Sequence, residues 1–224
     1  MIEVEKWLPM AFDGLHKAFG PRLRYLGLQG SYRRGEATES SDLDLVTILD
    51  EVSLRDLDQY RAIVRALPEG DKACGFICEE TELSRWPRHE LFPFKMDTRD
   101  FHGRLEDFIP SIDRAEVIEG VRISSSALLH FLRHSYIYAS PEARPGILKE
   151  SFKAAYFVIL VNSYLMTGIY CSSKKELLKV LEGTEKIIVS AGLQFSDWLG
   201  RQSEQEAFDL LIGWAQRTLM CDFA

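Results

Sequence analysis

Two aspartates, Asp42 and Asp44, lie two positions apart at the start of an aliphatic segment, LDLVTIL at residues 43–49. In an extended strand, residues i and i+2 leave the same face, so these carboxylates would lie about 6.5 Å apart. Two carboxylates this close raise each other's pKa unless a cation lies between them. Because hard divalent cations such as Mg²⁺ prefer oxygen ligands, the pair predicts a Mg²⁺ site.

A second motif precedes this pair. Gly30 and Ser31 follow the apolar segment RLRYLGLQ at residues 22–29. A glycine lets the backbone approach a phosphate, and a helix that begins there would direct N–H groups towards it. Arg33 and Arg34 follow closely and could neutralise phosphate charge, or they could lie in a solvated loop. Each motif alone is typical of a turn or a solvated strand end, but their order on successive predicted strands indicates a site.

The combined pattern resembles the signature of the DNA polymerase β-like nucleotidyltransferase superfamily: an apolar strand, Gly-Ser, a spacer, then Asp-apolar-Asp-apolar. The spacer ends in Ser41-Asp42, which is similar to the small-ligand and antibiotic nucleotidyltransferases of the aminoglycoside type. The resemblance implies an enzyme that transfers a nucleoside monophosphate from a nucleoside triphosphate, with ATP favoured, to a hydroxyl of a small acceptor. Pyrophosphate would be released, and Mg²⁺ would be the cofactor.

The resemblance also implies roles for individual residues. The two aspartates would be catalytic and would bind the Mg²⁺ ions that bridge the triphosphate. The nucleotide would be bound by Gly30, Ser31, Arg33, Arg34 and Ser41.

A third carboxylate on a later strand usually completes such a site and can accept the proton of the acceptor hydroxyl. The predicted strand from Ala73 to Cys78 has no acid at its start. Asp97, at the end of the segment LFPFKM, is the preferred catalytic and metal-binding candidate, and Glu79 and Glu80 are alternatives. The absence of a third acid, with weak or lost activity, is also left open.

The elements around these motifs follow from residue spacing. Apolar residues from Trp7 to Phe19 predict a helix that ends at Gly20-Pro21. A capping box of Ser53 and Asp56 predicts another helix. We expect strands at 22–29, 43–49, 73–78 and 91–96, and only helices, in four or five segments, from residue 124 onward with breaks that include Gly168, Gly183 and Gly192.

This order predicts an α+β nucleotidyltransferase domain with a short mixed sheet over residues 1–115, followed by an all-α helical bundle over residues 120–224. The net charge of −7 argues against a protein that coats nucleic acid. The four cysteines are too irregularly spaced for a zinc site, which favours a reduced, cytoplasmic setting. The apolar run at 154–170 contains polar residues and is shorter than a membrane span, so we expect a buried helix and no membrane partner.

Two other functions fit the same motif. One is an antitoxin-like enzyme that transfers AMP to a protein. The other is a degenerate nucleotide-binding module without turnover, which the missing acid at the start of the third strand favours. The sequence does not indicate the acceptor, the oligomeric state or which nucleotide is used.

Overall fold

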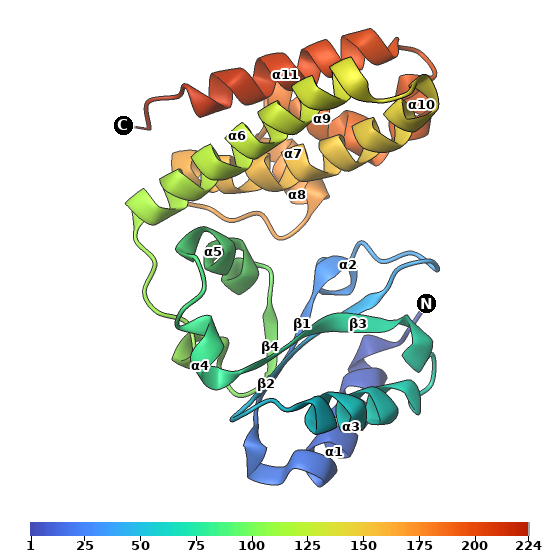
Figure 1. Cartoon of the computed structure of the whole chain (residues 1–224), viewed down its shortest axis with the longest axis vertical. Coiled ribbons are helices and arrows are strands. Elements are labelled where there is room, and N and C mark those ends of the chain that lie inside the picture. The colour runs from blue at the N-terminus through green and yellow to red at the C-terminus, as the bar shows by residue number, and fades with distance from the viewer. Residues whose placement is uncertain (224) are drawn as a thin grey trace. The chain divides into compact units, whose positions relative to one another are not determined.

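A computed structural model describes residues 1–223 and divides the chain into two compact units, Met1–Ser111 and Ile112–Ala224. The first unit contains a four-stranded sheet with helices, and the second contains helices (Figure 1). The expected fold class, an α+β domain followed by a helical region, is confirmed. The assignment of functional domains to residues 1–115 and 120–224 stays a prediction.

The sheet of the first unit has the order β3-β2-β1-β4. β1 is antiparallel to both β2 and β4, whereas β2 and β3 are parallel. A parallel pair needs a crossover connection, which a helix between β2 and β3 provides. The strands are β1 (Leu23–Gln29), β2 (Leu43–Leu49), β3 (Ala73–Glu79) and β4 (Arg99–His102).

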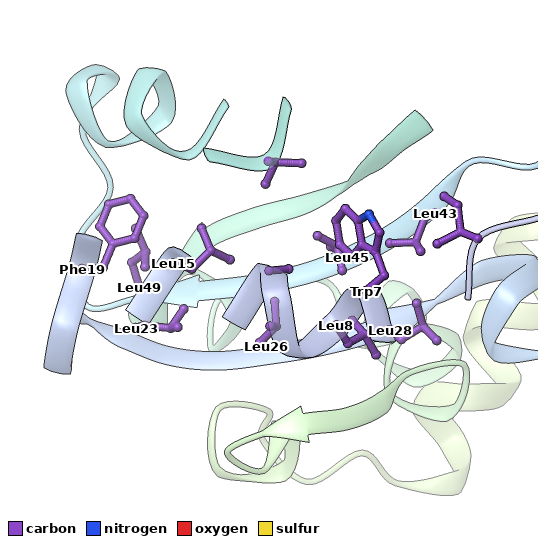
Figure 2. Packing of buried hydrophobic residues seen from close by; sticks show 13 residues of the cluster. Trp7, Leu8, Leu15, Phe19, Leu23, Leu26, Leu28, Leu43, Leu45 and Leu49 are labelled. Atoms are coloured by element: carbon purple, nitrogen blue, oxygen red, sulfur yellow. The ribbon is translucent and has the colours of Figure 1, made fainter. Parts of the chain in front are cut away.

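Helices α1 (Val4–Phe19) and α3 (Leu54–Arg65) cover one face of this sheet. The apolar positions of α1 pack on alternate residues of β1 and β2, such as Leu26 and Leu45 (Figure 2). Complete burial of a leucine side chain stabilises the fold by about 1.5–3 kcal/mol, so this face forms the core of the unit. The predicted helix end at Gly20 is confirmed, because α1 stops at Phe19.

The capping box predicted for the crossover helix α3 is also present. The backbone N–H of Asp56 donates to the Ser53 hydroxyl at 3.2 Å, and the backbone N–H of Ser53 donates to the Asp56 carboxylate at 2.9 Å. These two bonds satisfy N–H groups that have no partner inside the helix.

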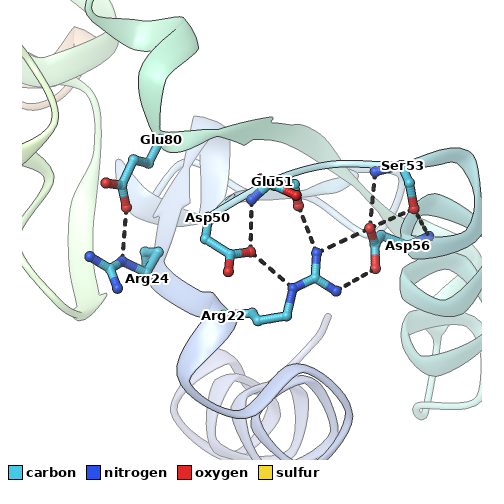
Figure 3. A network of polar contacts seen from close by, with 7 residues as sticks. All are labelled: Arg22, Arg24, Asp50, Glu51, Ser53, Asp56 and Glu80. Carbon is cyan, nitrogen blue, oxygen red and sulfur yellow. Dashed lines mark hydrogen bonds and ion pairs between the residues drawn. The ribbon is translucent and has the colours of Figure 1, made fainter.

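Arg22 ties this cap to the strands (Figure 3). Its guanidinium lies 2.8 Å from a carboxylate oxygen of Asp56 and 2.9 Å from one of Asp50. The Arg22 guanidinium, assisted by the Ser53 hydroxyl, holds the pKa of Asp56 well below its usual range. The network therefore fixes where β1 begins, where β2 ends and where α3 starts.

The strand predicted at residues 91–96 is wrong. This segment belongs to α5 (Arg88–Met96), which follows the short helix α4 (Glu80–Leu83), and the fourth strand is Arg99–His102. A run of six mostly apolar residues does not distinguish a strand from a helix that buries one side. Here the helix buries Leu91 and Phe92.

The second unit contains six α-helices among its described residues, one more than the largest number expected. Helix α7 contacts α6, α9 and α11, which explains its apolar sequence. Gly168 ends α7 in a left-handed conformation with φ of 72°, as its position predicts, and α9 ends at Leu193, one residue after the break expected at Gly192. The helices are α6 (Arg114–Tyr138), α7 (Arg144–Thr167), α8 (Lys174–Val180), α9 (Gly183–Leu193), α10 (Phe195–Leu199) and α11 (Glu204–Leu219).

Short 3₁₀ turns lie at Gly20–Arg22, Gly70–Lys72, Leu105–Asp107 and Pro141–Ala143. Within residues 1–223, none of the helices combines the length and the apolar character needed to cross a bilayer.

Candidate active site

The site begins where β1 ends and the short helix α2 (Gly30–Arg33) starts. Gly30 has a φ of 70°, a conformation that glycine adopts at little cost. A Cβ atom at this position would lie 1.8 Å from the Oδ2 atom of Asp44. The backbone of the Gly-Ser motif therefore lies directly against one carboxylate of the Asp-x-Asp motif, which is possible only without a side chain at position 30.

The two motif carboxylates differ in burial. Asp42 lies just before β2 and is exposed, whereas Asp44 is within β2 and is partly buried. Leu43 and Leu45, which alternate with Asp44, are completely buried in the core beneath α1 and α3. Because side chains alternate along a strand, Asp44 belongs to the opposite face of the sheet.

Asp97 follows the last residue of α5, and the backbone N–H of Gly30 is close enough to favour the charged form of its carboxylate and so to lower its pKa. The guanidinium of Arg34 forms an ion pair with one oxygen of Asp97, and that of Arg33 lies 3.8 Å from the other. Burial raises the pKa of Asp97 above its ordinary value, and the two arginines oppose this effect. The structure therefore brings Gly30, Asp44 and Asp97 together with both arginines of the spacer.

The two arginines do not lie in a solvated loop. Their side chains are only 17% and 12% exposed for Arg33 and Arg34, respectively. Arg33 also donates to the Met96 carbonyl at 2.9 Å, and Arg34 lies 3.4 Å from the carboxylate of Glu36. Two positive charges thus stand next to the Gly-Ser backbone, where a phosphate group would be attracted.

Gln29 is a position at the candidate site that the motif analysis missed. It is the last residue of β1 and is paired with Asp44 across the strands. Its side-chain amide donates to the Phe94 carbonyl at 3.1 Å and to the Thr98 hydroxyl at 2.6 Å. These bonds attach the end of α5 to the end of β1 and so hold Asp97 in place. In the sequence, only the presence of a polar residue directly before Gly-Ser, at the end of an apolar strand, indicates that Gln29 lies at the site.

Glu79 and Glu80 lie at the opposite end of the sheet from the motif carboxylates. Since β3 is parallel to β2, the residue beside Asp44 is Cys74, which is exposed, while Glu79 is paired with Leu49. Five strand residues separate the two positions, a distance of roughly 16 Å. Glu80 forms an ion pair with Arg24 at 2.9 Å. The register separates both alternative acids from Asp44.

The two serines of the motif have different settings. Ser31 lies within α2 and is partly buried, next to Gly30. Ser41 closes a turn before Asp42, since its hydroxyl accepts from the backbone N–H of Thr38 at 2.8 Å. Ser31 is thus the chain neighbour of Gly30, which lies against the Asp44 carboxylate. Ser41 shapes the loop that leads into β2.

Comparison with known proteins finds a domain match over the residues that form this site. Residues 22–109 match the family model of the nucleotidyltransferase domain. The chain carries a nucleotidyltransferase domain. The resemblance drawn from the Gly-Ser and Asp-x-Asp motifs is confirmed, and so is the enzyme class, a transferase.

Solved structures resemble the whole chain. One is the crystal structure of spectinomycin adenyltransferase AAD(9) from Enterococcus faecialis with ATP and spectinomycin, at 15% sequence identity and a TM-score of 0.57. The match covers 97% of this chain and 99% of that one, so the two proteins share a fold over their full lengths. The curated proteins contain no match.

The acidic groups of the nucleotidyltransferase domain fit a hard cation only in part. Asp42 and Asp44 offer the carboxylate oxygens that Mg²⁺ prefers. Within residues 1–223, however, no three histidine, cysteine or acidic side chains gather into a group that could hold a metal ion. Asp97 faces the guanidinium groups of Arg33 and Arg34 instead. The donor set therefore fits a cation held by two carboxylates and by oxygens of the triphosphate.

Proposed function

We propose that this nucleotidyltransferase domain transfers a nucleoside monophosphate, with ATP as the favoured donor, to a hydroxyl group of a small acceptor and releases pyrophosphate. The family match supports the reaction type. The observation that carries the proposal is the close approach of Gly30 to Asp44, which sets the backbone of the Gly-Ser motif against a carboxylate of the Asp-x-Asp motif.

Each part of the site has a proposed role. Ser31 and the guanidinium groups of Arg33 and Arg34 bind phosphate oxygens of the donor, because bidentate guanidinium groups suit phosphate geometry. Asp42 and Asp44 hold Mg²⁺, which when bound neutralises the charge that develops on the triphosphate. Ser41 keeps the loop before Asp42 in the shape that presents this carboxylate.

Asp97 is the proposed acceptor of the proton that leaves the attacking hydroxyl. Its burial raises its pKa, and a carboxylate with a raised pKa is a stronger general base. Arg34, which is paired with Asp97, would turn towards the triphosphate when the donor binds. The Arg34 guanidinium would then bind a phosphate oxygen of the donor, and the Asp97 carboxylate could accept the proton of the attacking hydroxyl.

We propose aminoglycoside-type antibiotics as the first class of acceptor to test. The net charge of −7 suits a polycationic acceptor. The similar crystal structure holds ATP and spectinomycin, which supports the choice of antibiotics as the first acceptors to test. Nucleic acid is not expected as a partner.

The test is to incubate the protein with Mg²⁺, each labelled nucleoside triphosphate and a panel of hydroxylated acceptors that includes aminoglycosides and spectinomycin. We expect one acceptor to become labelled while an equal amount of pyrophosphate is released, and we expect D44N to abolish both. Pyrophosphate release by D44N at the rate of the unaltered protein would overturn the proposed site.

One observation favours a second candidate function, a nucleotide-binding domain with little turnover. Cys74 occupies the position beside Asp44 on β3, where the third acid of these enzymes was first expected. This candidate predicts Mg²⁺-dependent binding of ATP without label transfer to any acceptor. Introducing an acid with C74E would then produce measurable transfer. This result would show that the missing acid, and not the choice of acceptors, explains the absence of transfer in the unaltered protein.

A further inference from the structure

The helical unit contains a cavity of 370 Å³ at the junction of α9 and α10. Cavities that bind small molecules have volumes of about 300–1,000 Å³, so this one is large enough for a single-ring ligand. Its lining combines one aromatic side chain with charged and amide groups from both helices. None of these residues belongs to the matched nucleotidyltransferase domain.

The apolar wall of the cavity is fixed by the protein. Trp198 is partly buried, and its ring meets that of Phe152 at 5.2 Å between centroids with an interplanar angle of 66°. Phe152 is itself 1% exposed, and Ala191, also 1% exposed, is one of the residues that line the cavity. A tryptophan held in this way offers a ring surface whose orientation does not have to be selected during binding.

The polar side chains of the cavity make no polar contacts that stabilise the described part of the fold. In the described part of the chain, the side chains of Lys186, Arg201 and Asp197 form no ion pair or hydrogen bond, with one another or with other residues. The amide of Gln194, at the same cavity, likewise has no partner there. Four different chemical groups, an ammonium, a guanidinium, a carboxylate and an amide, therefore face one cavity without a partner in the described part of the chain.

The charges in this cavity select the sign of a ligand. Two cations and one carboxylate give a local charge of +1 in a chain whose net charge is −7. A guanidinium and an ammonium group together suit an anionic group, and the amide and carboxylate can accept N–H or O–H groups. The Trp198 ring suits a planar ring, since offset stacking and edge contacts add to the area buried.

We propose that this cavity binds a small anionic molecule that carries an aromatic ring, such as an aryl phosphate or an aryl carboxylate. The anionic group contacts Lys186 and Arg201, and the ring packs on Trp198. The proposal is independent of the nucleotidyltransferase activity, because it uses no residue of the candidate active site.

The experiment titrates four probes into the protein and follows tryptophan fluorescence and calorimetric heat. Phenyl phosphate and benzoate carry both a ring and an anion, inorganic phosphate lacks the ring, and benzyl alcohol lacks the charge. We expect saturable binding of phenyl phosphate or benzoate in the range of about 1 mM or tighter, and the stronger of the two identifies the anion. Inorganic phosphate and benzyl alcohol are expected to bind at least about tenfold more weakly.

Two double variants with the same change of charge separate this site from general electrostatics. K186Q/R201Q is expected to weaken binding of the better probe by roughly tenfold or more, because two charged donors are lost. K175Q/K179Q alters two exposed lysines of α8 outside the cavity and is expected to leave binding unchanged. W198F should remove the fluorescence response, and D44N should leave binding intact, which separates this site from the candidate active site.

The proposal is overturned if neither aryl anion binds saturably, if inorganic phosphate binds as well as phenyl phosphate, or if K175Q/K179Q weakens binding as much as K186Q/R201Q does.

Discussion

Replacing Gly30 with alanine tests the contact on which the candidate site depends. The new Cβ atom would lie 1.8 Å from Oδ2 of Asp44, whereas ordinary contact begins at 3.4 Å, so the carboxylate must move by about 1.6 Å. Since Oδ2 is the end of a side chain, it can move without unfolding the protein. A displacement of about 1 Å in a catalytic group can lower the rate by about 100-fold.

The chain provides a matched control for this change. Gly35 has a φ of 67°, close to the 70° of Gly30, but a Cβ atom at position 35 would meet nothing within 4 Å. An alanine at either position is strained by about 1–2 kcal/mol in the left-handed conformation. We therefore expect G30A and G35A to share the loss of stability that comes from backbone strain, and G30A to lose more because it also displaces the Asp44 side chain.

Two measurements separate these effects. Urea unfolding gives the free energy of unfolding for both variants, and calorimetry gives the Mg²⁺-dependent affinity for a non-hydrolysable ATP analogue. We expect G30A to lose most of this affinity, and about 100-fold in transfer rate with a suitable acceptor, while G35A retains both. Equal affinities and rates in the two variants would refute the reasoning, because the Gly30 contact would then have no functional role.

Three further changes test other parts of the structure. C74E places an acid beside the second motif carboxylate, and calorimetry should show Mg²⁺-dependent nucleotide affinity rising by about tenfold; no gain would argue against a cation at that face. Arg22 depresses the pKa of Asp56, so the charged form stabilises the fold above about pH 4, and this contribution is lost as the pH falls through the lowered pKa. D56N should therefore lower the melting temperature at pH 7 more than at pH 3, and an equal loss at both would contradict the ion pair. A double-mutant cycle of R34Q and D97N, followed by urea unfolding, should give a coupling energy of about 1–3 kcal/mol, and additive effects would contradict their contact.

The sequence predicts the central motif and the elements on either side because these depend on local patterns. Alternating leucines around Asp44 predict a strand with one buried face. Glycine at position 30 predicts a backbone conformation and a close approach that leave no room for a side chain. Both features are present in the structure. The cap formed by Ser53 and Asp56 is equally local and was equally predictable.

The features that the sequence does not predict depend on how distant segments meet. The position of Glu79 relative to Asp44 follows from the parallel direction of β3, which a short strand does not reveal. The ion pair of Arg34 with Asp97 joins residues 63 positions apart. The partial burial of Asp97 follows from α5, where a short apolar run indicated a strand.

The most direct test of the candidate active site is a transfer assay with ATP labelled at its α-phosphate, in the presence and absence of Mg²⁺, for the unaltered protein and for D42N and D44N. We predict that label moves to a hydroxylated acceptor with release of pyrophosphate, that chelation of Mg²⁺ stops it, and that each substitution abolishes it. Transfer that persists in D42N and D44N would contradict the assignment of these carboxylates. The absence of both transfer and Mg²⁺-dependent ATP binding in the unaltered protein would contradict the nucleotide site itself.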